Sequence, residues 1–129
     1  MKKFETKAII PAKPDAVYKA WLSAKLHAAM TGGAAKKKRK LNAKFTAWDG
    51  YISGKNLELK PGKKIVQSWR TVEFPPDAPD SQLVVKFNPH PKGCELIIQH
   101  TNIPNGQSDY KKGWRDHYFI PMKAYFSGK

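Results

Sequence analysis

Short runs of apolar and aromatic residues alternate with polar ones through the middle of this chain. Strands are expected at 43–48, 51–59 and 63–70, because each run is short and rich in aromatic or branched residues. Asp49-Gly50 suits a tight hairpin, since glycine accepts positive φ without steric cost. Pro61-Gly62 suits the next turn, since proline presets φ at its first position. The pattern predicts an antiparallel meander.

Three further strands are expected outside the meander. The first covers residues 3–10, and two later ones cover 83–87 and 94–101, where apolar and polar positions alternate. The residues from 88 to 93 are expected to form the turn between these two strands. The segment from Phe74 to Ser81 contains three prolines, which exclude it from a sheet interior and predict an exposed loop.

Two short helices are expected after the first strand. Pro14-Asp15 begins one of them, because proline fits the first turn and an acid there suits the helix dipole. Val17, Trp21 and Leu22 follow at spacings that place them on one apolar face. Ser23 can cap a second helix that continues to about Met30.

A longer amphipathic helix is expected at the C-terminus, from about residue 106 to 126. At helical spacing, one narrow arc of this helix carries Tyr110, Trp114, Tyr118, Pro121 and Tyr125, whose aromatic members form a stripe. Pro121 removes a backbone hydrogen bond and is expected to bend the helix. Gly113 removes a side chain beside the stripe, and we expect it to allow close approach to the sheet.

The order of these elements predicts one α+β domain over residues 1–129. Its fold would be a curved antiparallel sheet of about six strands wrapped around the long C-terminal helix. A chain of 129 residues with 40% hydrophobic composition can bury roughly two-thirds of its unfolded surface.

The facing surfaces of helix and sheet predict an apolar cavity, because a bent sheet and one helix seldom close without a void. The expected lining residues are Phe45, Trp69, Leu83, Val85, Leu96, Ile98, His100, Trp114 and Tyr118. The alternative interpretation is plain core packing. His100 shares the alternation of its strand's inward residues, so it is either a contact for a polar ligand atom or a hydrogen-bonded structural histidine.

The meander also carries a resemblance to a known family. The block Phe-x-Ala-Trp-Asp-Gly-Tyr-Ile-x-Gly-x-Asn-x-x-Leu begins at Phe45, and Ser-Trp-Arg closes the meander at Arg70. Together with Thr31-Gly32-Gly33, with 100–104 and with 114–122, these motifs resemble the activator of heat-shock chaperone ATPase homologue (AHSA-type) family. That family is a branch of the START-like, or SRPBCC, helix-grip superfamily, and the resemblance covers nearly the whole chain.

The resemblance implies a helix-grip fold and leaves three functions open. The first is a non-enzymatic domain that binds a small apolar ligand in the cavity. The alternative is a co-chaperone-like protein that binds the heat-shock chaperone ATPase, and a remote alternative is a cyclase-like or hydrolase-like enzyme. Two-domain members of the family place another domain ahead of one like this, so little stimulation of a chaperone ATPase is expected from this chain.

The formal net charge of +14 favours anionic partners. However, 21 of the 24 basic residues are lysine, whereas nucleic-acid recognition favours the planar fork of arginine. The dense basic run comprises Lys36, Lys37, Lys38, Arg39 and Lys40. It is expected either to contact polyanions weakly and without sequence preference or to be a solvated loop.

No motif predicts catalytic, metal or cofactor chemistry, because His-x-x-x-His and Cys-x-x-Cys spacings are absent. We therefore expect no enzyme activity, no cofactor and no metal. Cys94 is the single cysteine, so no internal disulfide is possible and the cytoplasm is the expected compartment. No apolar run approaches the roughly 20 residues of a membrane span. Monomer and homodimer both remain open.

Overall fold

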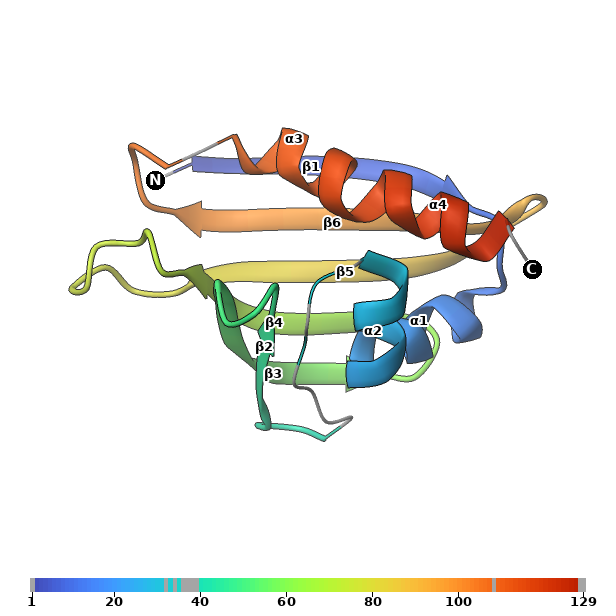
Figure 1. Cartoon of the computed structure of the whole chain (residues 1–129), viewed down its shortest axis with the longest axis horizontal. Coiled ribbons are helices and arrows are strands. Elements are labelled where there is room, and N and C mark those ends of the chain that lie inside the picture. The colour runs from blue at the N-terminus through green and yellow to red at the C-terminus, as the bar shows by residue number, and fades with distance from the viewer. Residues whose placement is uncertain (1, 32, 34, 36–39, 108, 128–129) are drawn as a thin grey trace.

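A six-stranded antiparallel sheet forms the frame of the protein in a computed structural model that describes residues 2–31, 33, 35, 40–107 and 109–127 (Figure 1). The strands are β1 (Lys2–Ile10), β2 (Lys44–Ala47), β3 (Ile52–Lys60), β4 (Lys64–Thr71), β5 (Ser81–His90) and β6 (Gly93–Ile103). Their order in the sheet is β1-β6-β5-β4-β3-β2. β1 therefore lies at one edge beside the last strand, and the meander continues to the other edge.

Helices cover one face of this sheet. Two short helices, α1 (Pro14–Leu22) and α2 (Ala24–Thr31), follow β1, and the C-terminal helix lies in front of β1 and β6 (Figure 1). The C-terminal helix consists of α3 (Tyr110–Trp114), the π-helical turn η1 (Arg115–Phe119) and α4 (Ile120–Ser127). The predicted α+β helix-grip architecture is confirmed. Within the described residues, no helix is both long and apolar enough to cross a bilayer.

The first hairpin confirms the Asp-Gly turn and shortens the strand before it. Trp48, Asp49 and Gly50 all have positive φ, at 53°, 58° and 89°, and the Tyr51 N–H donates to the Trp48 carbonyl at 3.1 Å. A tryptophan in this conformation cannot continue a strand, so β2 ends at Ala47 rather than at the predicted residue 48.

The second long hairpin continues further than predicted. The ladder between β5 and β6 extends to His90 opposite Gly93, although Pro89 suggested that the strand ends at Phe87. Pro89 is tolerated because the pairing of β5 with β4 stops at Lys86. Beyond that point β5 has one neighbour only, so the missing proline N–H does not break a second ladder.

The C-terminal helix begins later than predicted. Gly106 has φ of +82°, which no helical residue adopts, and the Asp109 side chain caps the helix by accepting from the Lys112 N–H at 3.1 Å. The turn that precedes Pro121 is irregular, as a proline in the helix leads one to expect: the Ile120 N–H donates to the carbonyl of Arg115 across a wider π-helical turn.

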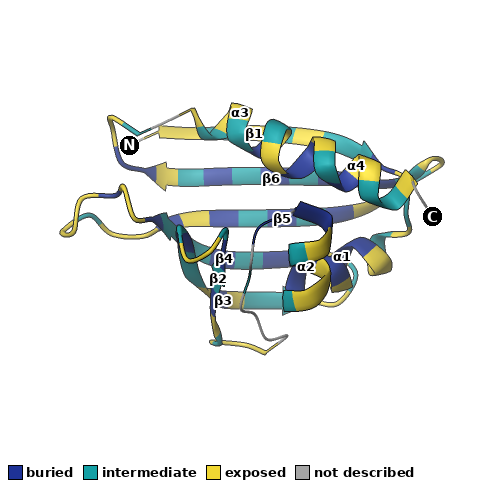
Figure 2. Ribbon diagram, viewed as in Figure 1, coloured by how far each residue is buried: buried dark blue, intermediate teal, exposed yellow. Residues whose placement is uncertain are grey.

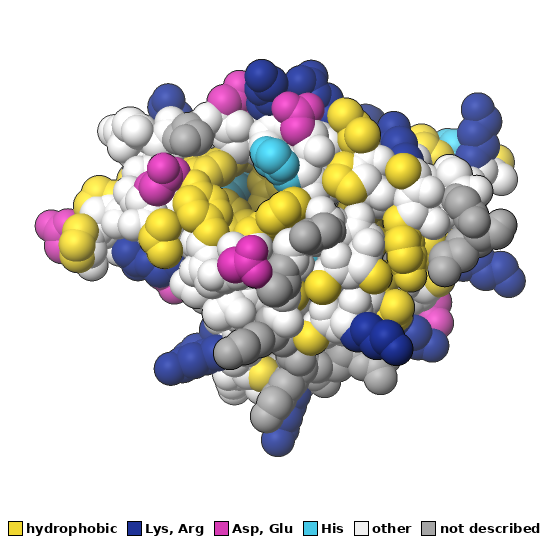
Figure 3. Space-filling view, in the orientation of Figure 1, with side chains coloured by type: hydrophobic (Ala, Val, Ile, Leu, Met, Phe, Trp, Pro, Cys, Tyr) yellow, Lys and Arg dark blue, Asp and Glu magenta, His cyan; other side chains and the backbone are white. Residues whose placement is uncertain are grey.

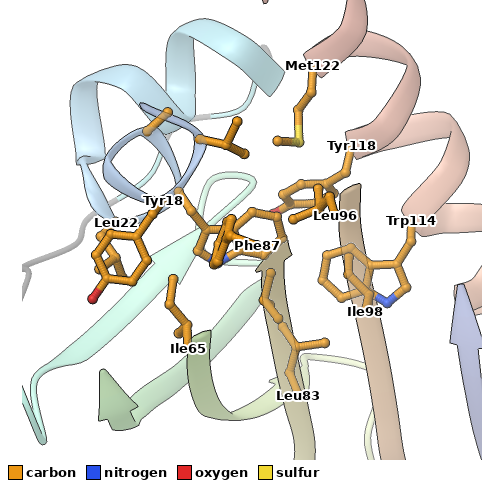
Figure 4. Packing of buried hydrophobic residues seen from close by; sticks show 14 of the residues in the cluster. Tyr18, Leu22, Ile65, Leu83, Phe87, Leu96, Ile98, Trp114, Tyr118 and Met122 are labelled. Atoms are coloured by element: carbon orange, nitrogen blue, oxygen red, sulfur yellow. The ribbon is translucent and has the colours of Figure 1, made fainter. Parts of the chain in front are cut away.

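The core lies between the sheet and the helices. Alternate residues of β5 and β6 are buried, among them Leu83, Leu96 and Ile98 (Figure 2). Trp114, Tyr118 and Met122 point from the C-terminal helix toward these strands (Figure 4). Their burial fixes the helix on the sheet. The first half of the helix lies near the β2–β3 turn and the end of β4.

Candidate ligand-binding pocket

A pocket of about 620 Å³ opens between α3, η1, the β2–β3 turn and the strands behind them. Figure 3 shows it as a hollow with hydrophobic side chains gathered around it. Six aromatic residues line it: Trp48, Tyr51, Trp69, Tyr110, Trp114 and Tyr118. The remaining lining residues are Ile52, Asp109, Lys112, Gly113, Asp116 and His117. The pocket is therefore mainly aromatic, with charged groups of both signs.

Helical spacing places three of these aromatic rings along one wall. Tyr110, Trp114 and Tyr118 are four residues apart, so their side chains share one helix face. The ring centroids of Trp114 and Tyr118 lie 4.7 Å apart. Trp69 of β4 meets this row, with its ring centroid 5.6 Å from that of Trp114 and 5.2 Å from that of Tyr110. The result is a continuous aromatic surface built by helix and sheet.

Trp48 covers the other end of this surface. Its ring lies against His117 and Tyr118, with centroid distances of 5.6 Å and 6.4 Å. A Cβ atom at Gly33 would stand 2.5 Å from Cε3 of Trp48, so the chain must carry glycine there for this ring to fit. The left-handed turn and this close approach together hold Trp48 beside the helix.

A polar cluster joins the hydroxyl groups of two pocket-lining tyrosines to residues outside the pocket lining. Tyr51 donates to Oε1 of Glu73 at 2.5 Å, and Tyr110 donates to Oε1 of Gln107 at 2.8 Å. The hydroxyl oxygens of Thr71 and Tyr110 are 3.3 Å apart. Burial and the hydrogen bond to Glu73 raise the pKa of Tyr51 to about 12, and burial raises the pKa of Tyr110. Both tyrosines therefore remain protonated at neutral pH.

His100 is a buried structural group behind the aromatic wall. Trp114 Nε1–H donates to His100 Nδ1 at 3.2 Å, so the ring carries its proton on Nε2 and donates to Ser81 Oγ at 2.8 Å. Ser81 Oγ–H in turn donates to the carbonyl of Trp69 at 2.6 Å. Burial lowers the pKa of His100 to about 3, so the ring is neutral at physiological pH. This arrangement fits the structural alternative weighed for His100.

The residues expected to line a cavity divide into two groups. Trp69, Trp114 and Tyr118 lie on the pocket wall. The other six, Phe45, Leu83, Val85, Leu96, Ile98 and His100, are buried in the core behind it. The pocket therefore lies where β3 begins and β4 ends, whereas the sequence suggested that it would lie over the centre of the sheet. The expectation that Gly113 allows close approach of the helix to the sheet was wrong. A Cβ atom there would meet nothing within 4 Å, so the missing side chain leaves open space at the pocket.

Several pocket residues were not among the predicted lining residues, notably Trp48, Tyr51, Tyr110 and His117. Tyr110 belongs to the aromatic stripe, so its spacing was an available signal. Trp48 and Tyr51 flank the Asp-Gly turn, but the local sequence does not predict which element this turn lies against. The pairing of Ile52 with Thr71 brings that turn beside the end of β4, and only the register of the sheet reveals this.

A second, basic groove of about 470 Å³ runs between β1 and the C-terminal helix. Five cationic residues line it, namely Lys7, Lys111, Lys112, Arg115 and Lys123. The apolar wall includes Ile120, which is 56% exposed. Figure 3 shows Lys and Arg side chains gathered along the edge of the molecule formed by β1 and the helix. The predicted polyanion contacts Lys36, Lys37, Lys38 and Arg39 fall outside the described residues, and Lys40 is exposed.

Comparisons with known sequences point to one family. The sequence profile described as "Activator of Hsp90 ATPase homolog 1-like protein" matches residues 11–127. The chain is 26% identical over 125 residues to "Activator of 90 kDa heat shock protein ATPase homolog 1" of Homo sapiens, covering 96% of this chain and 37% of that protein. It is 33% identical over 86 residues to the homologue of Dictyostelium discoideum, covering 65% of this chain and 22% of that protein. The matched regions thus span 37% of the human protein and 22% of the Dictyostelium one.

Solved structures share the fold. A crystal structure of PFC0360w, described as an HSP90 activator from Plasmodium falciparum, superposes with a TM-score of 0.86 at 22% identity, covering 98% of this chain and 97% of the other. The solution structure of the Aha1 dimer from Colwellia psychrerythraea superposes with a TM-score of 0.81 at 14% identity, covering 100% and 99%. At these identities the likeness concerns the fold alone.

Proposed function

The chain belongs to the family of Activator of Hsp90 ATPase homolog 1-like proteins, and from that premise we propose that it is a non-enzymatic domain that binds a small apolar ligand. The observation that supports this most is the pocket of about 620 Å³ with six aromatic residues. Ligand sites commonly have volumes of about 300–1,000 Å³ and apolar walls with a few polar groups.

The shape of the wall favours a flat ligand. Tyr110 and Tyr118 are eight residues apart, which corresponds to a span of at most about 12 Å at the rise of an α-helix, because the π-helical turn from Arg115 to Phe119 is more compact along the axis. Trp69 and Trp114 line the same pocket, and each residue is 3% exposed, so a ligand meets only the edge of these rings. Aromatic rings gain most from offset or edge-to-face contacts with other rings, so a molecule of two or three fused rings fits this length.

The arrangement of charged groups supports binding rather than catalysis. His100 has both ring nitrogens engaged and lies behind the wall. Asp116 accepts from Arg115 Nε at 3.1 Å, and Asp109 caps the helix. General acid–base catalysis needs a titratable group within hydrogen-bond reach of the reacting atom. Both carboxylates of the pocket thus have structural partners, and the ring of its histidine, His117, packs against Trp48, so we assign the pocket a binding role.

Native mass spectrometry of the protein purified from its own host tests this function. We expect a retained small molecule of apolar character. Gly113→Leu provides the blocked variant, because residue 113 lines the pocket and has open space in front of it. It should abolish retention, whereas Gly113→Ala should preserve much of it. A wild-type protein that retains nothing and binds no flat aromatic probe contradicts the proposal.

We propose as a second candidate function that the chain binds an Hsp90-type chaperone. The relatives named above support it, and so does the basic groove between β1 and the C-terminal helix. Clustered positive charge speeds encounter with an acidic surface and orients it. The exposed Ile120 lines the same groove and offers an apolar contact beside its charged side chains.

Binding and ATPase assays with the host's own chaperone test this second function. We expect salt-sensitive binding with little or no stimulation of turnover, because the chain corresponds to 37% of the human activator that it resembles. Lys111→Glu with Arg115→Glu should weaken binding at least tenfold. The matched control pair, Lys55→Glu with Lys92→Glu, removes the same charge from exposed sites outside the groove and should have a smaller effect. Strong stimulation at physiological salt would make the chaperone function primary.

We infer a cytoplasmic location from the chemistry of Cys94. This buried cysteine is a free thiol, and burial raises its pKa to about 11. Such a thiol stays protonated and is a poor nucleophile. Free thiols are typical of reducing compartments. Imaging of the protein tagged in its host tests the location.

A further inference from the structure

The polar cluster at the two pocket-lining tyrosines has a definite hydrogen-bond direction. A carboxylate oxygen and an amide oxygen can only accept, so the hydroxyl protons of Tyr51 and Tyr110 point to Glu73 and Gln107. Because the Tyr110 proton is used in this way, Thr71 Oγ1–H is the donor in its contact with Tyr110.

The hydroxyl protons of Tyr51, Tyr110 and Thr71 are therefore all donated to acceptors within the protein. Thr71 Oγ1 additionally accepts from the Glu73 N–H at 3.1 Å, and Gln107 Nε2–H donates to the Glu73 carbonyl at 3.3 Å. Each phenol oxygen accepts up to two hydrogen bonds. The Tyr110 oxygen already accepts from Thr71, and Tyr51 interacts with Thr71 and Tyr110, so part of this acceptor capacity is used within the cluster. Because both tyrosines line the pocket, the lone pairs that remain are what they can offer a ligand, and the Glu73 carboxylate bonded to Tyr51 adds negative charge.

We propose that the ligand of this pocket carries an aryl hydroxyl or amino group and donates its hydrogen bond to the oxygens of Tyr51 and Tyr110. Its rings then lie against Trp69 and Trp114, which share the pocket with both tyrosines. This inference rests on the proposed ligand-binding function and names the chemistry of the ligand. A ligand that carries only acceptor atoms near Tyr51 and Tyr110 would form no hydrogen bond with them, because both partners would then present lone pairs.

A matched pair of probes tests the direction of the hydrogen bond. 2-Naphthol and 2-methoxynaphthalene share one ring system, and only the former donates a hydrogen bond. Titrations followed by the indole signals of the ¹⁵N-labelled protein in two-dimensional NMR give both affinity and location. We expect 2-naphthol to bind at least about tenfold more tightly, the ratio typical of one unmade hydrogen bond in a partly buried site.

Two conservative variants, one double and one single, assign the effect to the two oxygens. Tyr51→Phe combined with Tyr110→Phe keeps both rings and removes both acceptors. We expect the preference for 2-naphthol to fall to less than about threefold, with the affinity for 2-methoxynaphthalene unchanged. Tyr125→Phe is the control, because this tyrosine lies on α4 outside the pocket-lining set. It should leave the preference intact.

The outcomes separate this inference from the function on which it rests. Equal binding of the two probes to the wild type, or tighter binding of 2-methoxynaphthalene, would overturn the donor assignment and leave the pocket as a ligand site. A preference for 2-naphthol that survives the double variant would also overturn it. Failure of both probes to bind would count against the ligand-binding function itself.

Discussion

Individual residues of the meander motif have specific structural tasks. Asn56 is buried, and its side chain accepts from Gln67 Nε2 at 2.9 Å and donates to the Lys40 carbonyl at 3.1 Å. It thereby joins two strands to the loop that leads into β2. Gly54 allows close packing of β3, since a Cβ atom there would stand 1.9 Å from the carbonyl oxygen of Ser68 and 2.8 Å from the Phe45 ring.

Gly54→Ala should therefore destabilise the protein. The clash is with backbone, which cannot swing away, so we expect the free energy of unfolding to fall by about 2 kcal/mol or more. Gly113→Ala is the matched control, because it adds the same methyl group to open space on a helix and should raise stability by about 0.5–1 kcal/mol. Urea denaturation measures both. Equal effects would contradict the close approach of β3 and β4.

The buried ring of His100 predicts a pH dependence of stability. Its pKa falls from 6.5 to about 3 on folding, so below pH 6.5 the unfolded chain binds a proton that the folded protein does not. Stability from this group is complete above pH 6.5 and decreases as the pH falls toward 3. Between pH 7 and pH 5 the wild type should lose about 2 kcal/mol more than His100→Asn, at about 1.4 kcal/mol per pH unit.

Urea denaturation at both pH values measures this difference. His90→Asn serves as the control, because this histidine lies at the turn between β5 and β6 rather than in the core. It should behave as the wild type does. If the wild type and His100→Asn lose the same free energy of unfolding between pH 7 and pH 5, the folded protein accommodates a charged His100.

Among the elements, the C-terminal helix joins the two halves of the fold. Trp114 stacks on Trp21 of α1 with a centroid distance of 6.0 Å. Tyr118 donates to His27 Nε2 at 2.9 Å, and His27 Nδ1–H donates to the carbonyl of Trp21 at 3.0 Å. The π-helical turn brings Tyr118 and Phe119 into the core together. One helix therefore anchors α1, α2 and the sheet while its first half forms the pocket wall.

Trp114→Ala should remove much of this anchoring. Trp114 is 3% exposed, and truncation of a buried aromatic costs about 3–5 kcal/mol. The midpoint of chemical denaturation should fall clearly, while Lys112→Ala, an exposed neighbour on the same helix, should hardly change it. Small and equal effects of the two substitutions would mean that the helix is docked in another way.

At the scale of the whole molecule, positive charge dominates the surface. The net charge of +14 is spread mainly over lysines, and the ion pairs within the described residues join side chains that are 27–62% solvent-accessible. Exposed pairs of this kind contribute little to stability. The charge therefore acts on encounters with other molecules, and the groove along β1 is the described place where it is concentrated.

Polyanion binding should accordingly be weak and ionic. We expect the affinity for single-stranded DNA of random sequence to fall by at least tenfold between 50 and 200 mM salt, because bound counterions are released. Replacing Lys36, Lys37, Lys38, Arg39 and Lys40 by glutamine should reduce the slope with salt. Fluorescence anisotropy measures both. Tight, sequence-selective binding that survives high salt would indicate a dedicated nucleic-acid site.

Local sequence was sufficient to predict the elements of this fold. Alternation, Asp49-Gly50 and Pro61-Gly62 predict the meander, and four-residue spacing predicts the C-terminal helix, because these signals depend on neighbours along the chain. Some predicted limits were wrong, since β2 ends earlier and β5 ends later than expected. The left-handed Trp48 and the tolerated Pro89 depend on which strands pair beside them, and that pairing is not written in the local sequence.

Only the tertiary structure decided which residues form the site. Trp69, Trp114 and Tyr118 lie on the pocket wall, whereas Leu83, Leu96 and four other expected lining residues are buried behind it. Alternation along the strands predicts that both the pocket-wall residues and the core residues point inward. It does not predict whether another side chain fills the volume in front of them. That depends on where the helix crosses the sheet and on strand register, which place residues far apart in sequence side by side. Sequence alone therefore determined the fold, while long-range packing determined the pocket and its polar cluster.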